Sequence, residues 1–290
     1  MKLPQFEYLA PSTTDEVVKL LASRPGEAKI IAGGQSLLPT MAFRLAQPAL
    51  LVDLRNLRGL GEITIDHSGV RLGARTRWRD IEDDARLDIA HPLLREAIRH
   101  VAHYQVRNRG TVGGSLAHAD PASEMPCIAA TCEAELRVLG PRGERVVKAP
   151  DFFLGPLTTA LTDDEMILEV RLPSWPHDRR WAFSEFARRR GDFALAGVAL
   201  FFDVDEAGRA RNAHIGVVGA CYHAKRLSLA EQALEGKTVD AATAAAVARI
   251  AAQECDAPGD FHASAEYRRS LVATLLERAL GAVAARHLPA

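Results

Sequence analysis

The sequence has no marked charge excess, few aromatic residues and no long apolar run. Its 290 residues include 36 lysines and arginines against 37 aspartates and glutamates, which leaves a formal net charge of −1. Such a balance gives no general attraction to nucleic acid or to an anionic membrane. The start, Met1 to Glu7, lacks the apolar core of a signal peptide, and the alanine-rich stretch 241–252 is short and interrupted by Arg249. We therefore expect a cytoplasmic globular protein with neither nucleic acid nor membrane insertion.

The sequence contains few cysteines, and their spacing matches no common metal-binding motif. The four cysteines are Cys127, Cys132, Cys221 and Cys255, and none forms a Cys-x-x-Cys pair. Zinc sites and ferredoxin-type iron–sulfur clusters need closely spaced thiolates, so neither is expected on this chain. We expect reduced, buried thiols and no metal site.

Two common nucleotide-binding motifs are also missing. The sequence contains neither Gly-x-Gly-x-x-Gly at a strand-to-helix turn nor Gly-x-x-x-x-Gly-Lys-Ser/Thr, which disfavours a Rossmann dinucleotide site and a Walker-type nucleotidase. Two separate glycine pairs are present instead. They lie in Ala32-Gly33-Gly34-Gln35-Ser36-Leu37-Leu38-Pro39 and in Gly110-Thr111-Val112-Gly113-Gly114-Ser115-Leu116-Ala117.

Each glycine pair has the composition of a phosphate-binding loop. Glycines permit positive φ values and close approach of another group, and consecutive backbone N–H donors beside a helix start can bind phosphate oxygens. For one pair alone, a tight turn without ligand is the simpler interpretation. Two such loops could together enclose a diphosphate with little need for lysine, which fits a dinucleotide better than a transferable phosphate.

Helix and strand patterns divide the chain. The predicted elements of the first part are a helix ending at 24–26, a strand over 28–32, a helix over 35–45, a strand over 49–54, a hairpin over 62–72, a helix from His91 towards Arg107, and a hairpin turning at 140–143. Two prolines in 172–178 mark a linker. Beyond it, strands over 181–188, 197–204 and 213–220 predict an antiparallel sheet, followed by helices.

The residues of both loops resemble the FAD-binding medium subunit of molybdenum hydroxylases, the carbon monoxide dehydrogenase and xanthine dehydrogenase family. The second loop continues to match through His118-Ala119-Asp120-Pro121-Ala122-Ser123-Glu124, and Arg188-Arg189-Arg190-Gly191-Asp192-Phe193-Ala194 resembles a further family segment. The resemblance covers essentially the whole chain. It implies an α+β fold with a two-subdomain FAD-binding region of the PCMH type, followed by a C-terminal domain of antiparallel sheet plus helices. The expected domains are residues 1–174, with subdomains of about 1–55 and 56–174, and residues 178–290.

The same resemblance implies the residues that hold FAD. The two loops are expected to cradle the pyrophosphate, Glu124 to hold the adenosine ribose where relatives often have aspartate, and Phe193 to lie against the flavin ring where many have tyrosine. Leu195 stands where xanthine dehydrogenases have lysine, which weakens an inference of NAD as acceptor. The expected cofactor-binding residues are Ala32, Gly33, Gly34, Gln35, Ser36, Leu37, Val101, Thr111, Val112, Gly113, Gly114, Ser115, Ala117, Glu124, Leu161, Asp192 and Phe193.

The function implied is that of an oxidoreductase subunit that relays electrons and has no catalytic acid or base of its own. Molybdenum cofactor and iron–sulfur clusters are expected on a large and a small partner subunit, in an assembly of two heterotrimers. The rival hypotheses are a free-standing FAD oxidoreductase with its own substrate pocket and a scaffold without flavin. His118 and Asp120 are interpreted as loop residues rather than a metal pair, and Arg188 to Arg190 as a solvated or interface-facing run rather than a nucleic-acid patch.

Overall fold

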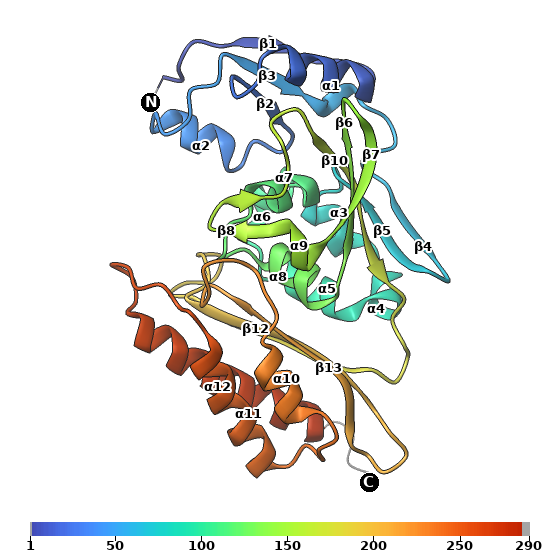
Figure 1. Cartoon of the computed structure of the whole chain (residues 1–290), viewed down its shortest axis with the longest axis vertical. Helices are drawn as coiled ribbons and strands as arrows, with labels where there is room; N and C mark the ends of the chain where they lie inside the picture. Colours follow the sequence, from blue (N-terminus) through green and yellow to red (C-terminus); the bar gives the residue numbers. More distant parts are fainter. Residues whose placement is uncertain (1, 286–290) are drawn as a thin grey trace.

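A computed structural model describes residues 2–285 and arranges them in three parts along the long axis of the molecule (Figure 1). Met1 and residues 286–290, at the ends of the two expected domains, lie outside the described residues. The first part is a parallel sheet of order β1-β3-β2 with two helices. Its elements are β1 (Glu7–Leu9), α1 (Thr14–Ser23), β2 (Ala28–Ile31), α2 (Leu37–Ala42), β3 (Leu50–Asp53) and the short 3-10 helix η1 (Leu54–Asn56).

The second part is an antiparallel sheet of order β4-β5-β10-β6-β7, packed against short helices. Its strands are β4 (Ile63–Asp66), β5 (Gly69–Gly73), β6 (Glu135–Gly140), β7 (Gly143–Lys148) and β10 (Met166–Pro173), with β8 (Phe153–Gly155) and β9 (Thr158–Thr159) forming a small separate pair. Its helices are α3 (Trp78–Asp83), α4 (Leu87–Ala90), α5 (Pro92–Ile98), α6 (Tyr104–Arg107), α7 (Val112–His118), α8 (Glu124–Thr131) and α9 (Ala149–Phe152).

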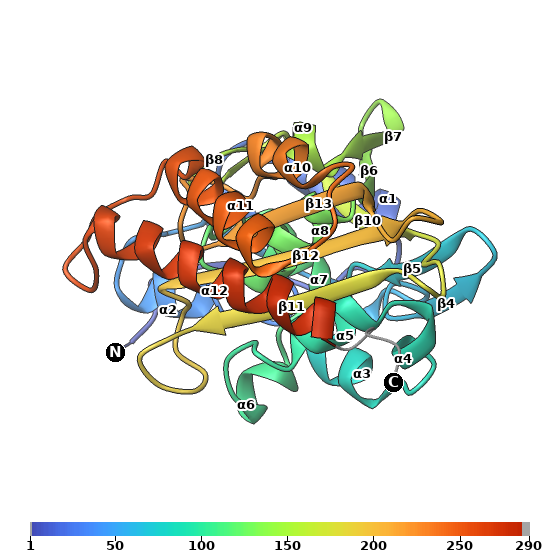
Figure 2. The same ribbon diagram turned by 90° about the horizontal axis from the view of Figure 1, so that it is seen from below.

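The third part is an antiparallel sheet of order β11-β12-β13 covered by three helices. Figure 2 shows the helices across the face of the sheet that is turned away from the rest of the chain. The elements are β11 (Arg180–Phe186), β12 (Ala196–Val204), β13 (Ala210–Val218), α10 (Ser228–Leu234), α11 (Ala241–Glu254) and α12 (Ala265–Ala285).

The third sheet contributes side chains to two different cores. Successive residues of a strand point to opposite faces. On β12, Val198 and Leu200 pack with the C-terminal helices, whereas Ala199 and Phe201 belong to the core of the second part. The sheet is therefore buried on both faces, which explains the continuous apolar run of β12.

Aromatic rings pack where the linker leads into the third sheet. Trp175 lies 4.5 Å from His91 and 5.3 Å from Phe201, measured between ring centroids. Arg179 lies over the rings of both Trp175 and Phe201 and pairs with Asp203 at 2.9 Å. Burial lowers the pKa of His91 to about 3, so this histidine is neutral within the junction.

The predicted residue ranges of two helices are wrong. The helix expected over 35–45 covers only Leu37–Ala42. The single helix expected from His91 towards Arg107 is two helices, α5 and α6, because Ala102 between them has a φ of 43°. A left-handed residue cannot continue a right-handed helix, and neither glycine nor proline marks the break in the sequence. The α+β class and the antiparallel sheet of the C-terminal part are confirmed.

Candidate functional site

A cavity of about 570 Å³ lies between the first and second parts of the chain and extends to the loop before β12. Its walls come from the β2–α2 loop, the segment 101–118, the start of α8, the segment 161–167 and residues 191–193. The expected cofactor residues are brought together here from distant parts of the sequence. Those that line the cavity are Ala32, Gly33, Gly34, Gln35, Ser36, Leu37, Val101, Thr111, Gly113, Gly114, Ser115, Ala117, Glu124, Leu161, Asp192 and Phe193.

The β2–α2 loop offers a run of unused backbone donors. Strand β2 ends at Ile31 and helix α2 begins at Leu37, so the intervening residues belong to neither element. Among the described residues, no protein acceptor pairs with the backbone N–H groups from Gly33 to Leu37. Gly34 has a φ of 72°, which turns the chain at the centre of this run. Five consecutive N–H groups beside a helix start form a site for phosphate oxygens.

The two glycine loops lie in direct backbone contact. A Cβ atom on Gly33 would overlap the carbonyl oxygen of Arg109 and lie 2.9 Å from the Cα of Gly110. Gly33 does not have a positive φ, so glycine is needed there for this close approach. On the other side, a Cβ on Gly110 would lie 2.6 Å from the indole nitrogen of Trp78. The absence of these side chains lets the loops form one continuous wall.

The second loop differs from the symmetrical amide cradle that we expected. Thr111 is the N-cap of α7, and its side chain accepts a hydrogen bond from the N–H of Gly114 at 3.2 Å. The N–H of Val112 donates to the oxygen of Thr76, and that of Gly113 donates to the oxygen of Ala74. These two amides tie α7 to the turn after β5, and their binding of phosphate stays a prediction.

Val112 and Gly113 have packing roles. Val112 is fully buried in the core of the second part and does not line the cavity, so its contact with the cofactor stays a prediction. A Cβ on Gly113 would lie 2.7 Å from the Cβ of Ala74. Gly114, Ser115 and Ala117 line the cavity from α7, and the glycine pair is helical rather than left-handed.

Glu124 brings a buried carboxyl to the cavity. It is the first residue of α8 and is only 7% exposed. Burial, and next the neighbouring charge of Asp120, raise the pKa of Glu124 to about 7. The charged form of this carboxyl therefore lacks the stabilising partners that water would provide, which leaves it available to hydroxyl donors.

Another part of the cavity wall is formed by residues 191–193. Gly191 has a φ of 88°, and a Cβ there would lie 2.7 Å from the carbonyl oxygen of Ala102. The segment consequently packs on the turn after Val101. Phe193 lines the cavity yet is 68% exposed, so one face of its ring is free. An exposed aromatic ring at a cavity mouth can stack on a planar ligand.

Sequence reasoning missed several lining residues, including Lys29, Trp78, His103 and Glu165. Glu165 binds Arg145 through both carboxylate oxygens at 2.7 Å and accepts the N–H of Thr162 at 2.9 Å. These contacts hold the pKa of Glu165 at about 2, with the Arg145 hydrogen bond as the largest cause. No local motif announces this ion pair, because Arg145 and Glu165 come from different strands and turns.

The cavity wall carries little positive charge. Lys29 is the only lysine on the described lining, which contains no arginine, and its Nζ pairs with Asp163 at 3.2 Å. An anionic group bound here would rely on neutral amide and hydroxyl donors, as the composition of the first loop predicts.

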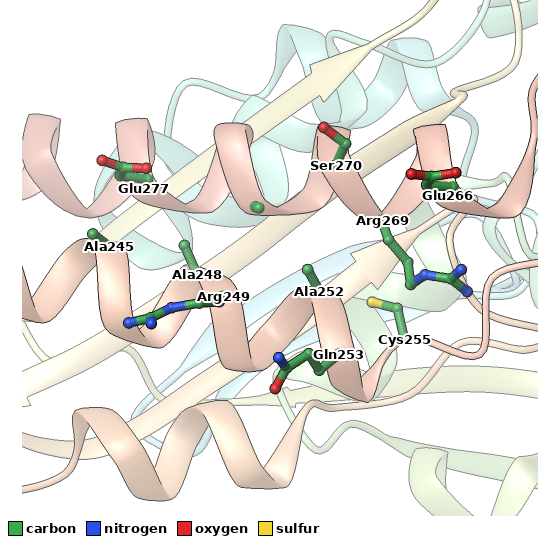
Figure 3. Close-up of a pocket in the computed structure, with 11 residues that line it drawn as sticks. Ala245, Ala248, Arg249, Ala252, Gln253, Cys255, Glu266, Arg269, Ser270 and Glu277 are labelled. Atoms are coloured by element: carbon green, nitrogen blue, oxygen red, sulfur yellow. The ribbon is translucent and has the colours of Figure 1, made fainter.

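A second cavity, also about 570 Å³, lies between α11 and α12 (Figure 3). Ala245, Ala248 and Ala252 of α11 face α12, and small side chains allow the two helices to lie close together. This groove shares no lining residue with the first cavity. It is not an extension of the site built by the glycine loops.

The remaining sequence candidates have structural explanations. The carboxylate of Asp120 accepts the N–H of Ala122 at 2.9 Å, which is a local loop hydrogen bond. Within residues 2–285, no cluster of three or more histidine, cysteine, aspartate or glutamate side chains could hold a metal ion. All four cysteines are free and buried. No helix in the described part of the chain is long and apolar enough to cross a membrane.

Comparisons with known proteins agree with this geometry. Residues 4–175 match the family described as the FAD binding domain in molybdopterin dehydrogenase, and residues 181–283 match the CO dehydrogenase flavoprotein C-terminal domain. The nicotine 6-hydroxylase medium subunit of Paenarthrobacter nicotinovorans is 40% identical over 286 residues, covering 99% of this chain and 100% of that protein. The carbon monoxide dehydrogenase medium chain of Hydrogenophaga pseudoflava is 36% identical, covering 98% of each chain.

Solved structures show the same architecture. A chain of carbon monoxide dehydrogenase from Hydrogenophaga pseudoflava superimposes with a TM-score of 0.95 at 37% identity, covering 99% of both chains. A chain of quinoline 2-oxidoreductase from Pseudomonas putida 86 gives a TM-score of 0.93 at 39% identity, again covering 99% of both. The protein therefore belongs to the family of FAD-binding medium subunits of molybdenum hydroxylases, and it is an oxidoreductase subunit with an FAD-binding domain.

Proposed function

We propose that this chain binds FAD in the cavity between its first and second parts and relays electrons from a partner's iron–sulfur clusters to an external acceptor. The observation that carries this proposal is the run of unpaired N–H groups from Gly33 to Leu37 beside the first cavity. These donors would bind the pyrophosphate, with the hydroxyl of Ser115 on the facing helix within the same cavity. Bound FAD supplies reversible electron transfer, and the protein supplies binding and orientation.

The other ends of the cavity suit the remaining parts of the cofactor. Glu124 offers acceptor oxygens to the two ribose hydroxyls, and its buried position disfavours water as a competitor. Phe193 would stack on the flavin ring, with Val101, Leu161 and Asp192 around it. The scarcity of cations on the wall disfavours a transferable phosphate group and is compatible with a resident diphosphate bound by neutral donors.

We infer two partner chains, a large subunit with molybdenum cofactor and a small subunit with iron–sulfur clusters, assembled as two heterotrimers. The names of the relatives support this, since two are medium chains and another is the alpha subunit of a 6-hydroxypseudooxynicotine dehydrogenase complex. The second cavity, between α11 and α12, lies apart from the glycine loops and so gives no support to a free-standing enzyme with a substrate pocket beside the flavin. We further propose a domain division at residues 174–178 and a cytoplasmic location, which suits four reduced cysteines.

The test is purification of the tagged chain from its native host, followed by identification of the co-purifying chains and measurement of FAD, iron and molybdenum. We expect FAD on this chain, molybdenum on a larger partner chain and iron on a smaller one. In the complex, the substrate of the large subunit should bleach the flavin absorbance. Bleaching by an organic substrate in the isolated chain would instead indicate a free-standing oxidoreductase.

A further inference from the structure

Glu185 of β11 points towards the FAD-binding part of the molecule. Alternate residues of β11 share a face, and Trp181 and Phe183, with the same parity as Glu185, pack against the core of the second part. Ala182, of opposite parity, packs with the C-terminal helices. The carboxyl of Glu185 therefore lies between the third sheet and the helices of the second part.

A missing side chain makes room for this carboxyl. Glu185 pairs with Gly197 on β12, and a Cβ on Gly197 would lie 3.4 Å from the Cγ of Glu185. The Oε2 atom of Glu185 is buried and has no hydrogen-bond partner within the described residues. A buried carboxylate oxygen without a donor is costly when charged.

The start of α8 packs against the same face of the third sheet, close to Gly197. The N–H of Gly219, just after β13, donates to the oxygen of Pro121 at 2.8 Å, and Val218 of β13 pairs with Gly197. One turn into α8, the Sγ of Cys127 lies 3.2 Å from where a Cβ on Gly216 would be. These contacts set the first turn of α8, with Glu124, over the strands that carry Gly197 and, beside it, Glu185.

The charge of Glu124 acts on Glu185, and neither carboxyl has a cation partner among the described residues. Burial raises the pKa of Glu185 to about 8, and the charge of Glu124 is the second cause. The pKa of the intervening Cys127 thiol is raised to about 12 by burial and, less strongly, by both carboxyls. No salt bridge in the described part of the chain includes either glutamate. Arg268 reaches the end of β13 from α12, but its side chain pairs with Asp260.

The other titratable groups around the pair do not supply a compensating charge. Asp120, in the loop before α8, adds negative charge beside Glu124. Just after α5, His100 packs on Phe183, but burial and, less strongly, the charge of Arg190 lower the pKa of this histidine, and Glu96 is its acidic neighbour. The facing positions of β12 are Gly197 and Ala199, which carry no charge.

We propose that Glu185 is a positioning residue for Glu124, and that the two carboxyls hold one proton between them, which is released when the hydroxyls of a ligand bind Glu124. Two buried carboxylates that repel each other retain a proton on one of them. Hydroxyl donors stabilise only the ionised form of Glu124, so binding displaces the proton to solvent. The ligand is the ribose of FAD, and in this respect the inference rests on the proposed function.

The experiment is calorimetric titration of the whole flavin-free chain with FAD near neutral pH, in two buffers with different enthalpies of ionisation. The difference between the two observed enthalpies gives the number of protons exchanged. We expect the wild-type chain to release up to about one proton per FAD, and its Kd to fall by up to about tenfold per pH unit as pH rises through the range where the pair titrates. In Glu185→Gln, Glu124 no longer shares a proton with a second carboxyl, and only its own burial and Asp120 favour its protonated form, so proton release should fall below the wild-type value and the Kd should vary less with pH.

Two further variants complete the test. Glu124→Gln should abolish proton release and weaken FAD binding, whereas Glu206→Gln, on the exposed turn after β12, should behave as wild type. Proton uptake, no proton exchange in the wild-type chain, or unchanged release in Glu185→Gln would overturn the proposal while leaving FAD binding intact. Failure of the wild-type chain to bind FAD would instead overturn the proposed function, and the role of the pair would fall with it.

Discussion

The carbonyl oxygen of Arg109 occupies the space that a side chain on Gly33 would need. This contact joins the β2–α2 loop to the segment before α7, and it places the two loops on one wall of the cavity. The position of the first loop is thus set by backbone packing as well as by its own turn.

Replacement of Gly33 by alanine should therefore separate the loops. We expect Gly33→Ala to weaken FAD binding by tenfold or more and to lower stability by about 1–3 kcal/mol, the usual cost of overpacking. Flavin fluorescence titration and thermal unfolding measure the two effects. Gly61→Ala is the matched control, because Gly61 has no neighbour within 4 Å of an added Cβ and no positive φ. Equal FAD affinity in both variants would show that the contact with Arg109 does not shape the site.

The two glycines of α7 should respond differently to alanine. Gly113→Ala meets the backbone and Cβ of Ala74, so it should destabilise the flavin-free chain by about 1–3 kcal/mol. Gly114→Ala faces the cavity and the Thr111 hydroxyl, where a gain in helix propensity of about 1 kcal/mol offsets a weakened N-cap of similar size. Urea unfolding should thus separate the variants, with Gly114→Ala near wild type in stability but weaker in FAD binding. The reverse order of stabilities would contradict the packing role of Gly113.

Glu124 should matter for the adenosine half of the cofactor alone. We expect Glu124→Gln to weaken FAD binding by about tenfold, since hydrogen bonds to a charged group contribute about 1.5–3 kcal/mol. Binding of FMN, which lacks the adenosine, should change little. Parallel titrations with both flavins test this, and an equal loss for FMN and FAD would place Glu124 away from the ribose.

The Arg145–Glu165 pair should make the free energy of unfolding depend on pH below about 4.5. The pKa of Glu165 is lowered in the folded chain to about 2 from an ordinary value of 4.5. A lowered pKa contributes stability above the unfolded value, and this contribution is lost as pH falls through the folded value. Glu165→Gln should destabilise the chain near neutral pH, and the difference from wild type should shrink between about pH 4.5 and pH 2. Urea midpoints across this range measure it.

Glu144→Gln provides the comparison for that experiment. Glu144 pairs with Arg137 at 3.0 Å but is 48% exposed, so solvent screens the interaction. We expect a change of less than about 1 kcal/mol at any pH for this variant. A similar effect of both substitutions would show that burial of Glu165 adds nothing to its ion pair.

Local sequence patterns predicted much of the fold. The turn Gly140-Pro141-Arg142-Gly143 marks the hairpin of β6 and β7, and the hairpin expected over 62–72 is formed by β4 and β5. Strand β10 was missed, although it is central in the second sheet, because its partners β5 and β6 are distant in sequence. The break at Ala102 was also missed, since no turn residue marks its positive φ, and the groups that contact its carbonyl, Gly191 and Arg107, come from later in the chain.

The sequence predicted most of the residues that line the cavity but not the contacts that bring them together. Residue identity alone does not distinguish a glycine that permits a positive φ, such as Gly34, from one that permits close packing, such as Gly33 or Gly113. Glu165 carries no motif, and the pairing of Glu124 with the region of Glu185 depends on the third sheet lying against α8. These relationships are long-range, and only the folded chain reveals them.

The third sheet is a wall shared by two cores, with Phe201 on one side and Leu200 on the other. A fragment that stops at the linker would leave α8 without its covering strands and would expose apolar surface in water. The two segments that match separate family models therefore bury apolar side chains against each other, and any recombination between relatives would have to exchange this sheet together with the helix it covers.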